Sequence, residues 1–152
     1  MITRSNRLTW VAWLLLAIIS AVLLVFPLLD VAGILKMGIP SDHTTAFRAL
    51  SGEDFTAFQS TGPAAYVRQL EYAYALHELT FGLFFLVIVL VPLHRGDRWA
   101  WWSCWIVLIA YVGYTITFAH YSSTTLVYSL VPDAAIPILL LVIAPHVLTK
   151  HA

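Results

Sequence analysis

The stretch EYAYALHELTFGLFFLVIVLVP, residues 71–92, decides the fold, because it is almost wholly apolar after its first eight residues. A helix needs roughly 20 residues to cross a bilayer core of about 30 Å, and this stretch is long enough. Its charged and imidazole side chains, Glu71, His77 and Glu78, gather at one end. An ionised carboxylate in hydrocarbon costs about 2.5–3.5 kcal/mol, so such groups usually face a protein interior or a water-filled cavity. The stretch therefore predicts a transmembrane helix with a polar mouth.

Composition places the whole chain among integral membrane proteins. Of its 152 residues, 61% are hydrophobic and 11% are charged, whereas about 25% of the residues of a soluble domain are charged. The formal net charge is zero and the chain has no basic block, which argues against nucleic acid as a partner. The single cysteine, Cys104, rules out an intrachain disulfide, and its position in an apolar run predicts a small buried thiol.

Four segments are long and apolar enough to span a bilayer. They are residues 8–29, the membrane part of a long helix over 63–92, residues 99–120 and residues of about 125–146. Arg4 and Arg7 ahead of the first segment resemble the start of a signal peptide. That segment is too long for a signal peptide, however, and no Ala-x-Ala-like site follows it, so we expect a retained helix. The sequence predicts an all-α protein, a four-transmembrane-helix bundle forming one domain over 1–152.

The segment between the first two membrane helices, residues 30–62, is too long for a plain connection. Ser51 and Asp54 form a Ser-x-x-Asp helix start, and Pro63 suits the first turn of the helix that follows. We therefore expect a partly helical extracytoplasmic loop. Its apolar side chains would pack as a small cap over one mouth of the bundle: Ala46, Phe47, Leu50, Phe55 and Phe58.

Basic residues and tryptophans flank the membrane segments unevenly. If the chain crosses four times, one side carries Arg4, Arg7, Arg95, Arg98 and Lys150, and all six tryptophans lie near it. Because positive residues mark the cytoplasmic side and Trp gathers at membrane interfaces, both termini should be cytoplasmic. The stretch RGDRWAWW, residues 95–102, together with the long loop before it, resembles small bacterial membrane proteins. That resemblance implies a bacterial inner or plasma membrane.

Helix geometry brings polar side chains to a similar depth near the outer ends of the segments. At 1.5 Å per residue, Glu78 lies about 8 Å inside the outer boundary and Asp133 about 9 Å inside it. Glu71, Tyr74 and Glu78 are spaced i, i+3, i+7, so they share one stripe of their helix. On the third segment, a similar stripe holds Thr117 with His120 or Tyr121, and Tyr114 lies beside it. Facing stripes would enclose an outward-opening polar pocket, with Asp30 near its mouth.

Carboxylates and a histidine in one pocket suit proton transfer, in which one group donates while another accepts. The candidate catalytic residues are Glu78, Asp133 and His77. The candidate ligand-binding residues are Glu71, Tyr74, Tyr114, Thr117, His120 and Tyr121. These residue types also bind metals, but the adjacent His-Glu pair lacks the His-Glu-x-x-His spacing. We therefore assign no metal ligand and expect no cofactor.

Several of these residues have plainer alternatives. Glu71 would be a solvated charge on the exposed end of a helix, His77 a packing histidine and His120 an ordinary interfacial residue. Asp133 follows Pro132, so it would be a first-turn carboxylate if a helix begins there.

Three functions fit the sequence. The preferred one is binding of a lipophilic small molecule or lipid, with isomerase-like or hydrolase-like acid/base catalysis. The alternative is a non-catalytic accessory or scaffold subunit of a membrane complex, and the third is a proton-linked transporter. The expected partners are the lipid bilayer and the lipophilic molecule, and a homo-oligomer is compatible with any of the three.

Overall fold

The computed structural model describes residues 4–36, 39, 41–59 and 62–149. The long helices are α1 (Arg4–Lys36), α4 (Gly62–Ile88), α5 (Arg98–Thr117) and α6 (Ser123–Thr149), and α2 (Ser41–Ser51) and α3 (Phe55–Phe58) lie between α1 and α4. A π-helical turn, η1 (Val89–Leu93), prolongs α4, and a 3-10 turn, η2 (Ala119–Tyr121), joins α5 to α6. The described residues form no strand, which confirms the predicted all-helical class. Four helices are long and apolar enough to cross a membrane.

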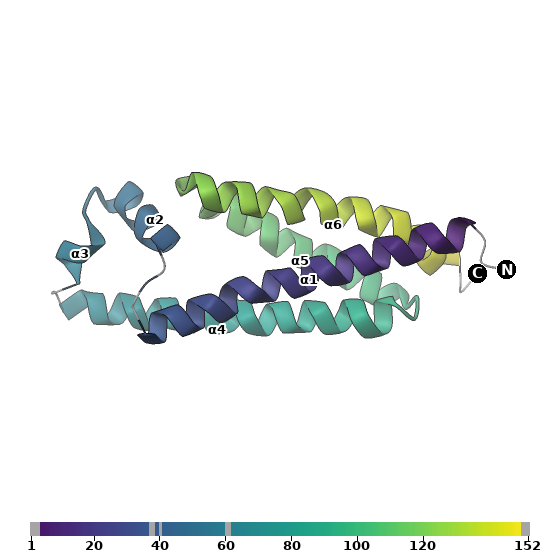
Figure 1. Cartoon of the computed structure of the whole chain (residues 1–152), viewed down its shortest axis with the longest axis horizontal. Helices are drawn as coiled ribbons and strands as arrows, with labels where there is room; N and C mark the ends of the chain where they lie inside the picture. Colours follow the sequence, from purple (N-terminus) through teal and green to yellow (C-terminus); the bar gives the residue numbers. More distant parts are fainter. Residues whose placement is uncertain (1–3, 37–38, 40, 60–61, 150–152) are drawn as a thin grey trace.

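The long helices run side by side as a bundle (Figure 1). α1 packs against α4 and α6, and α5 packs against the same two helices, so α4 and α6 occupy opposite corners. The start of α1, the end of α6 and the turn between α4 and α5 lie at one end of the bundle, which we call the terminal end (Figure 1). The helices α2 and α3 lie at the other, which we call the capped end.

Helix α1 is longer than the predicted segment 8–29. It continues through Asp30 to Lys36, so the predicted loop 30–62 begins later than expected. Residues 30–36, DVAGILK, contain no proline, and the single glycine among them does not end the helix. At 1.5 Å per residue α1 is about 50 Å long, which exceeds the bilayer core of about 30 Å. Lys150, which entered the expected orientation, lies outside the described residues.

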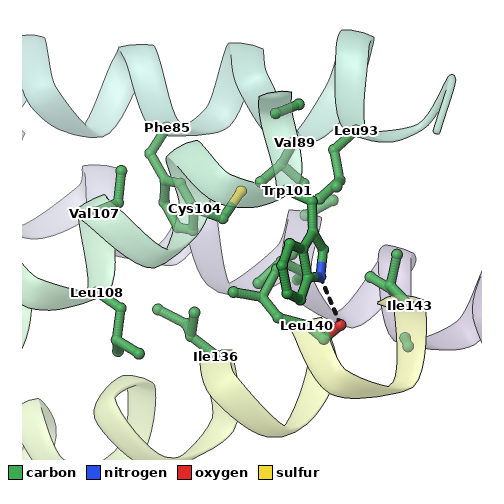
Figure 2. Packing of buried hydrophobic residues seen from close by; sticks show 14 of the residues in the cluster. Phe85, Val89, Leu93, Trp101, Cys104, Val107, Leu108, Ile136, Leu140 and Ile143 are labelled. Carbon is green, nitrogen blue, oxygen red and sulfur yellow. Dashed lines mark hydrogen bonds between the residues drawn. The ribbon is translucent and has the colours of Figure 1, made fainter. Parts of the chain in front are cut away.

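The hydrophobic core fills the terminal half of the bundle (Figure 2). Its members come from the first halves of α1 and α5, the end of α4 with η1, and the second half of α6. Leu16, Phe85 and Leu140 are fully buried in it, as is Cys104. The indole Nε1 of Trp101 donates a hydrogen bond of 2.9 Å to the Leu140 carbonyl (Figure 2), which joins α5 to α6.

Two further side chains tie the helices together at the terminal end. The indole Nε1 of Trp13 donates to the Val89 carbonyl at 2.7 Å, and the Trp13 ring contacts His94 in a tilted arrangement, 4.3 Å between centroids. Arg98, at the start of α5, donates to the Leu148 carbonyl at 2.6 Å. Gly96 has a φ of 81°, a left-handed conformation that suits glycine, and so permits the tight turn between η1 and α5.

An aromatic cluster holds α2 and α3 together at the capped end. The rings of Phe47, Phe55 and Phe58 pack with centroids 5.2–5.8 Å apart. Leu50 is 61% exposed, so it does not join the cap as predicted. Asp54 caps α3 by accepting from the backbone N–H and the hydroxyl of Thr56, which lowers the pKa of the Asp54 carboxyl.

The predicted Ser-x-x-Asp helix start is only half right. Asp54 is the N-cap residue of α3, but Ser51 is the last residue of α2. The Ser51 hydroxyl donates to the Phe47 carbonyl one turn earlier and accepts from the Glu53 N–H.

Gly82 lets α1 and α4 approach closely. A Cβ at this position would lie 2.9 Å from Cδ2 of Leu24, which is buried on α1. A Cβ at Gly113, on α5, would meet nothing within 4 Å. We expect Gly82→Ala to be less stable than Gly113→Ala by about 1 kcal/mol, because both gain helix propensity but only the first overpacks an interface. Unfolding in detergent measures the difference, and equal stabilities would contradict this packing.

Candidate functional site

A cavity of about 1120 Å³ lies in the capped half of the bundle. Side chains from all four long helices and from α2 line it. Seven of the nine predicted site residues are among them: Glu71, Tyr74, His77, Glu78, Tyr114, Thr117 and Asp133. The arrangement therefore brings most of the predicted polar residues to one place, whatever their role is.

His120 and Tyr121 do not line the cavity. The third segment, predicted as one helix over 99–120, ends as an α-helix at Thr117 and continues as the 3-10 turn η2. Phe118, at the junction, has φ −130° and ψ −52°, which is outside the helical region. His120 is exposed, and its ring contacts that of Tyr121 in a tilted arrangement, 3.9 Å between centroids. The predicted unbroken α-helix is wrong, and the structure does not bring these two residues to the cavity.

The stripe predicted on α4 faces the cavity. Glu71, Tyr74 and Glu78 all line it, as their i, i+3, i+7 spacing requires. Glu78 interacts electrostatically with Tyr74 and with Tyr111 of α5. The Tyr111 ring in turn packs against Phe81 and Phe85 at 6.1 and 6.4 Å between centroids. Tyr111 thus lies where the cavity meets the hydrophobic core.

His77 lies at the edge of the cavity and is exposed. Its Nδ1 is 2.6 Å from the Ala73 carbonyl on its own helix. Because a carbonyl oxygen only accepts, Nδ1 donates, and in the neutral ring Nε2 is then the acceptor. His77 and Phe81 also line a shallower groove on α4 with Leu76, Thr80 and Phe84.

Asp133 lies well inside α6, which begins at Ser123. The alternative in which Asp133 is a first-turn carboxylate after Pro132 is therefore wrong, because a helix proline does not mark a helix start here. The Oδ1 atom of Asp133 is buried and accepts no hydrogen bond from the described part of the chain. Pro137, four residues on, has no N–H to donate to the Asp133 carbonyl. The side-chain Oδ1 and the backbone carbonyl of Asp133 are therefore two acceptors that α6 itself does not satisfy in the usual way.

His43 lines the cavity, although no site role was predicted for it from the sequence. It lies on α2, it is only 7% exposed, and its Nδ1 is 2.5 Å from Oε2 of Glu71. Its ring also makes an edge contact with Phe118 at 5.0 Å. Glu71 is thus paired with the cap, and the alternative of a merely solvated charge is wrong. The two partners are 28 residues apart in the sequence, and no local pattern signals such a contact.

Asp30 also lines the cavity, from the part of α1 that extends beyond the predicted segment. The sequence placed it near the mouth of the pocket without a site role. Tyr128, Thr125 and Ser129 of α6 are further lining residues that depth arguments did not single out. Tyr128 packs against Phe26 of α1 at 5.9 Å between ring centroids. Most of the remaining lining is apolar, so polar groups are set into a hydrophobic wall.

A metal centre finds no support among the described residues. No three of their histidine, cysteine, aspartate or glutamate side chains are grouped so that they could hold a metal ion. The acidic residues of the cavity are instead distributed over α1, α4 and α6.

Similarity to known proteins gives no guide to what this cavity does. Comparison with protein-family models, with curated proteins and with solved structures finds no match for this chain.

Proposed function

We propose that this is an integral membrane protein that binds a lipophilic small molecule in the cavity of the capped half and acts on it by acid/base catalysis. One observation carries the proposal. Carboxylates, histidines and tyrosines from separate helices line a single cavity whose wall is otherwise largely apolar. Cavities that hold small molecules typically measure about 300–1,000 Å³ and combine apolar walls with a few polar groups. At about 1120 Å³ this one is large enough for a lipid-like molecule.

The proposed orientation places the terminal end in the cytoplasm of a bacterial cell and the cap outside. Arg7, Arg95 and Arg98 are exposed at the terminal end. The tryptophans Trp10, Trp99 and Trp102 are 54–60% exposed there, as expected of an interfacial belt. Both features support insertion with positive charge inside.

Cysteine labelling tests this orientation. The native Cys104 is buried, so we expect it to react little with the labelling reagent. In spheroplasts, a membrane-impermeant maleimide should label Glu53→Cys, which lies in the exposed segment between α2 and α3. Thr149→Cys, at the exposed end of α6, should react only after the membrane is permeabilised. The reverse pattern would overturn the orientation, and labelling of both without permeabilisation would argue against insertion.

The ligand is proposed to reach the cavity from the bilayer. His77 and Phe81 line both the cavity and the shallow groove on α4, so the two lie next to each other across these side chains. A molecule dissolved in hydrocarbon would therefore meet His77 on its way in. The packed terminal half, with Leu16, Phe85 and Leu140 fully buried, favours a cavity open at one end over a transport path.

Glu78 and Asp133 are the proposed acid/base pair. They lie on α4 and α6, at opposite corners of the bundle, so a bound molecule would lie between them. In an isomerisation, one carboxylate takes a proton from the ligand while the other, protonated, returns a proton at a second position. The pair exchanges protonation states and the ligand changes only its bonding. Tyr74 and Tyr114 would orient the molecule through their hydroxyls.

Extraction and isotope exchange test this function. Molecules that copurify with the protein are extracted, identified by mass spectrometry and returned to fresh protein in D₂O. The wild type should catalyse deuterium incorporation. Glu78→Gln and Asp133→Asn should slow it by at least about 100-fold, the scale of general acid–base catalysis. The control is Glu53→Gln, an exposed cap residue outside the cavity lining, which should behave as wild type.

The other outcomes separate the alternatives. If a copurifying molecule incorporates deuterium equally fast with wild type and with Glu78→Gln, the protein binds that molecule but Glu78 is not part of a catalytic pair. No specific molecule in wild type, with a loss of stability or of oligomeric state in Glu78→Gln, would instead favour a scaffold subunit whose polar layer fixes helix register.

A further inference from the structure

The charge of the cavity lining points to the class of ligand. The lining contains the carboxylates Asp30, Glu71, Glu78 and Asp133, and the described lining residues include no lysine or arginine. His43 and His77 are the only other titratable groups there that can carry positive charge. The lining thus holds four carboxyl groups against two imidazoles, so acidic groups outnumber basic ones even when one carboxyl of the proposed acid/base pair carries a proton. Like charges in an apolar surrounding repel strongly, so a bound cation would relieve that repulsion.

Aromatic rings surround the same space. Tyr74, Tyr111, Tyr114, Tyr128, Phe26, Phe81 and Phe118 all line the cavity. The Tyr114 and Phe118 rings lie 5.5 Å apart between centroids, and those of Phe26 and Tyr128 lie 5.9 Å apart. Ring faces attract organic cations, and aromatic walls combined with carboxylates are the usual recognition chemistry for ammonium groups. An anionic ligand would meet both the carboxylates and the negative ring faces.

Asp133 supplies a specific acceptor. Its Oδ1 is buried and has no hydrogen-bond partner among the described residues, so the protein itself leaves this cavity-lining carboxyl group incompletely satisfied, and a cation beside the group would offset part of that cost. The cavity is far larger than a bare ion, and the described residues offer no group of three metal ligands. A cation that suits this space would therefore be organic, with a hydrophobic body that fills the apolar part of the cavity.

We infer that the cavity selects a lipophilic organic cation, such as a long-chain or aryl amine. Its charged group lies between Glu78 and Asp133 and its body lies against the aromatic rings. This inference rests on the proposed binding function and narrows it to one class of molecule. Glu71, already paired with His43 at 2.5 Å, contributes less to the attraction than the other carboxylates.

Two hydrophobic ions of nearly equal size and opposite charge provide the test. Full-length protein in nanodiscs of zwitterionic lipid is dialysed against tetraphenylphosphonium, tetraphenylborate or the neutral triphenylphosphine oxide. Empty nanodiscs measure partitioning into lipid, and a second cation, dimethyldodecylamine, tests a ligand that carries an N–H donor. The wild type should bind both cations saturably, with an affinity for the phosphonium at least about tenfold above that for the borate.

Variants then locate the charge. Asp133→Asn and Glu78→Gln should each weaken phosphonium binding about tenfold, because each removes one charge from a site of low dielectric constant. Asp133→Asn should weaken amine binding further than phosphonium binding, since only the amine donates a hydrogen bond. Glu53→Gln, outside the lining, should bind as wild type. Each variant must first keep the wild-type helix content and elution volume.

The contrary outcomes are distinguishable. If triphenylphosphine oxide binds saturably but the cations show no preference over the borate, the cation inference falls and the binding cavity survives. If Asp133→Asn and Glu78→Gln leave cation binding unchanged, the charged group does not lie where we place it. If none of the probes binds above the empty nanodisc, the inference and the proposed binding function fail together.

Discussion

Truncating Phe85 to alanine is expected to lower the free energy of unfolding by about 3 kcal/mol. Phe85 is fully buried on α4, at the junction between the core and the cavity, and its ring packs against Tyr111. A Phe→Ala change in a soluble core costs about 3–5 kcal/mol. We expect the lower end of that range, because part of the cost in a soluble protein comes from exposing the ring to water on unfolding. A chain that stays in a bilayer or micelle when it unfolds exposes the ring to an apolar solvent instead.

The neighbouring Phe84 provides a matched control, since it lies on the same helix and is 66% exposed. Phe84→Ala removes the same atoms from the exposed side of α4 and should change stability by no more than about 0.5 kcal/mol. Unfolding of both variants in mixed micelles, followed by circular dichroism, measures the difference. Similar losses in the two would mean that Phe85 is not at the centre of packing.

A stable Phe85→Ala variant with an enlarged cavity should also bind bulkier probes.

Removing the imidazole of His43 is expected to release the cap from α4 and to cost about 2 kcal/mol. Leaving a buried group without its hydrogen-bond partner costs about 1–3 kcal/mol, more for a charged group, and the Glu71 side chain, at 23% exposure, recovers part of this by solvation. α2 packs chiefly against the turn η2 rather than against a long helix, so its loss of anchoring should exceed the loss of overall stability. Trypsin provides a direct readout, because Arg48 is exposed on α2. Cleavage there should become faster in His43→Ala.

A double-mutant cycle isolates the contact itself. If His43 and Glu71 interact directly, the loss in the double alanine variant should be smaller than the sum of the two single losses by about 1–2 kcal/mol. Additive losses would show that each side chain acts through other neighbours. Glu53→Ala, an exposed acid in the same segment, should leave both stability and cleavage unchanged.

Patterns that depend on the chain's own periodicity were the ones that sequence could predict. The apolar runs predict the long helices because a spanning helix requires a definite length of apolar residues. Glu71, Tyr74 and Glu78 share a face because of their helical spacing alone. Counting residues along the fourth segment from its terminal end predicted that Asp133 lies at the depth of Glu78, and both residues line the cavity.

Sequence-based prediction missed tertiary contacts and helix ends that no nearby residue pattern marks. His43 approaches Glu71 from a separate helix, and only the tertiary arrangement joins residues 28 positions apart. The α-helix of the third segment ends at Thr117 without a glycine or proline to mark the change, so His120 and Tyr121 were placed on the wrong face. α1 runs on past Leu29 because residues 30–36 lack a stop signal. The prediction ended this helix at Leu29 and so placed Asp30 in a loop, whereas Asp30 lies on α1 and lines the cavity.

The unequal helix lengths have a consequence for how a ligand is exchanged. α5, with 20 residues, is about 30 Å long and matches the hydrocarbon thickness, whereas α1, with 33 residues, is about 50 Å long. The cavity lies toward the end where α1 and α4 project, so in the proposed membrane orientation it would straddle the level at which acyl chains give way to headgroups. An amphiphile resting in the outer leaflet already has its polar end and its tail at these two depths. It would move sideways into the protein with little change in the solvation of either end, whereas the same molecule delivered from water would first have to partition into the leaflet.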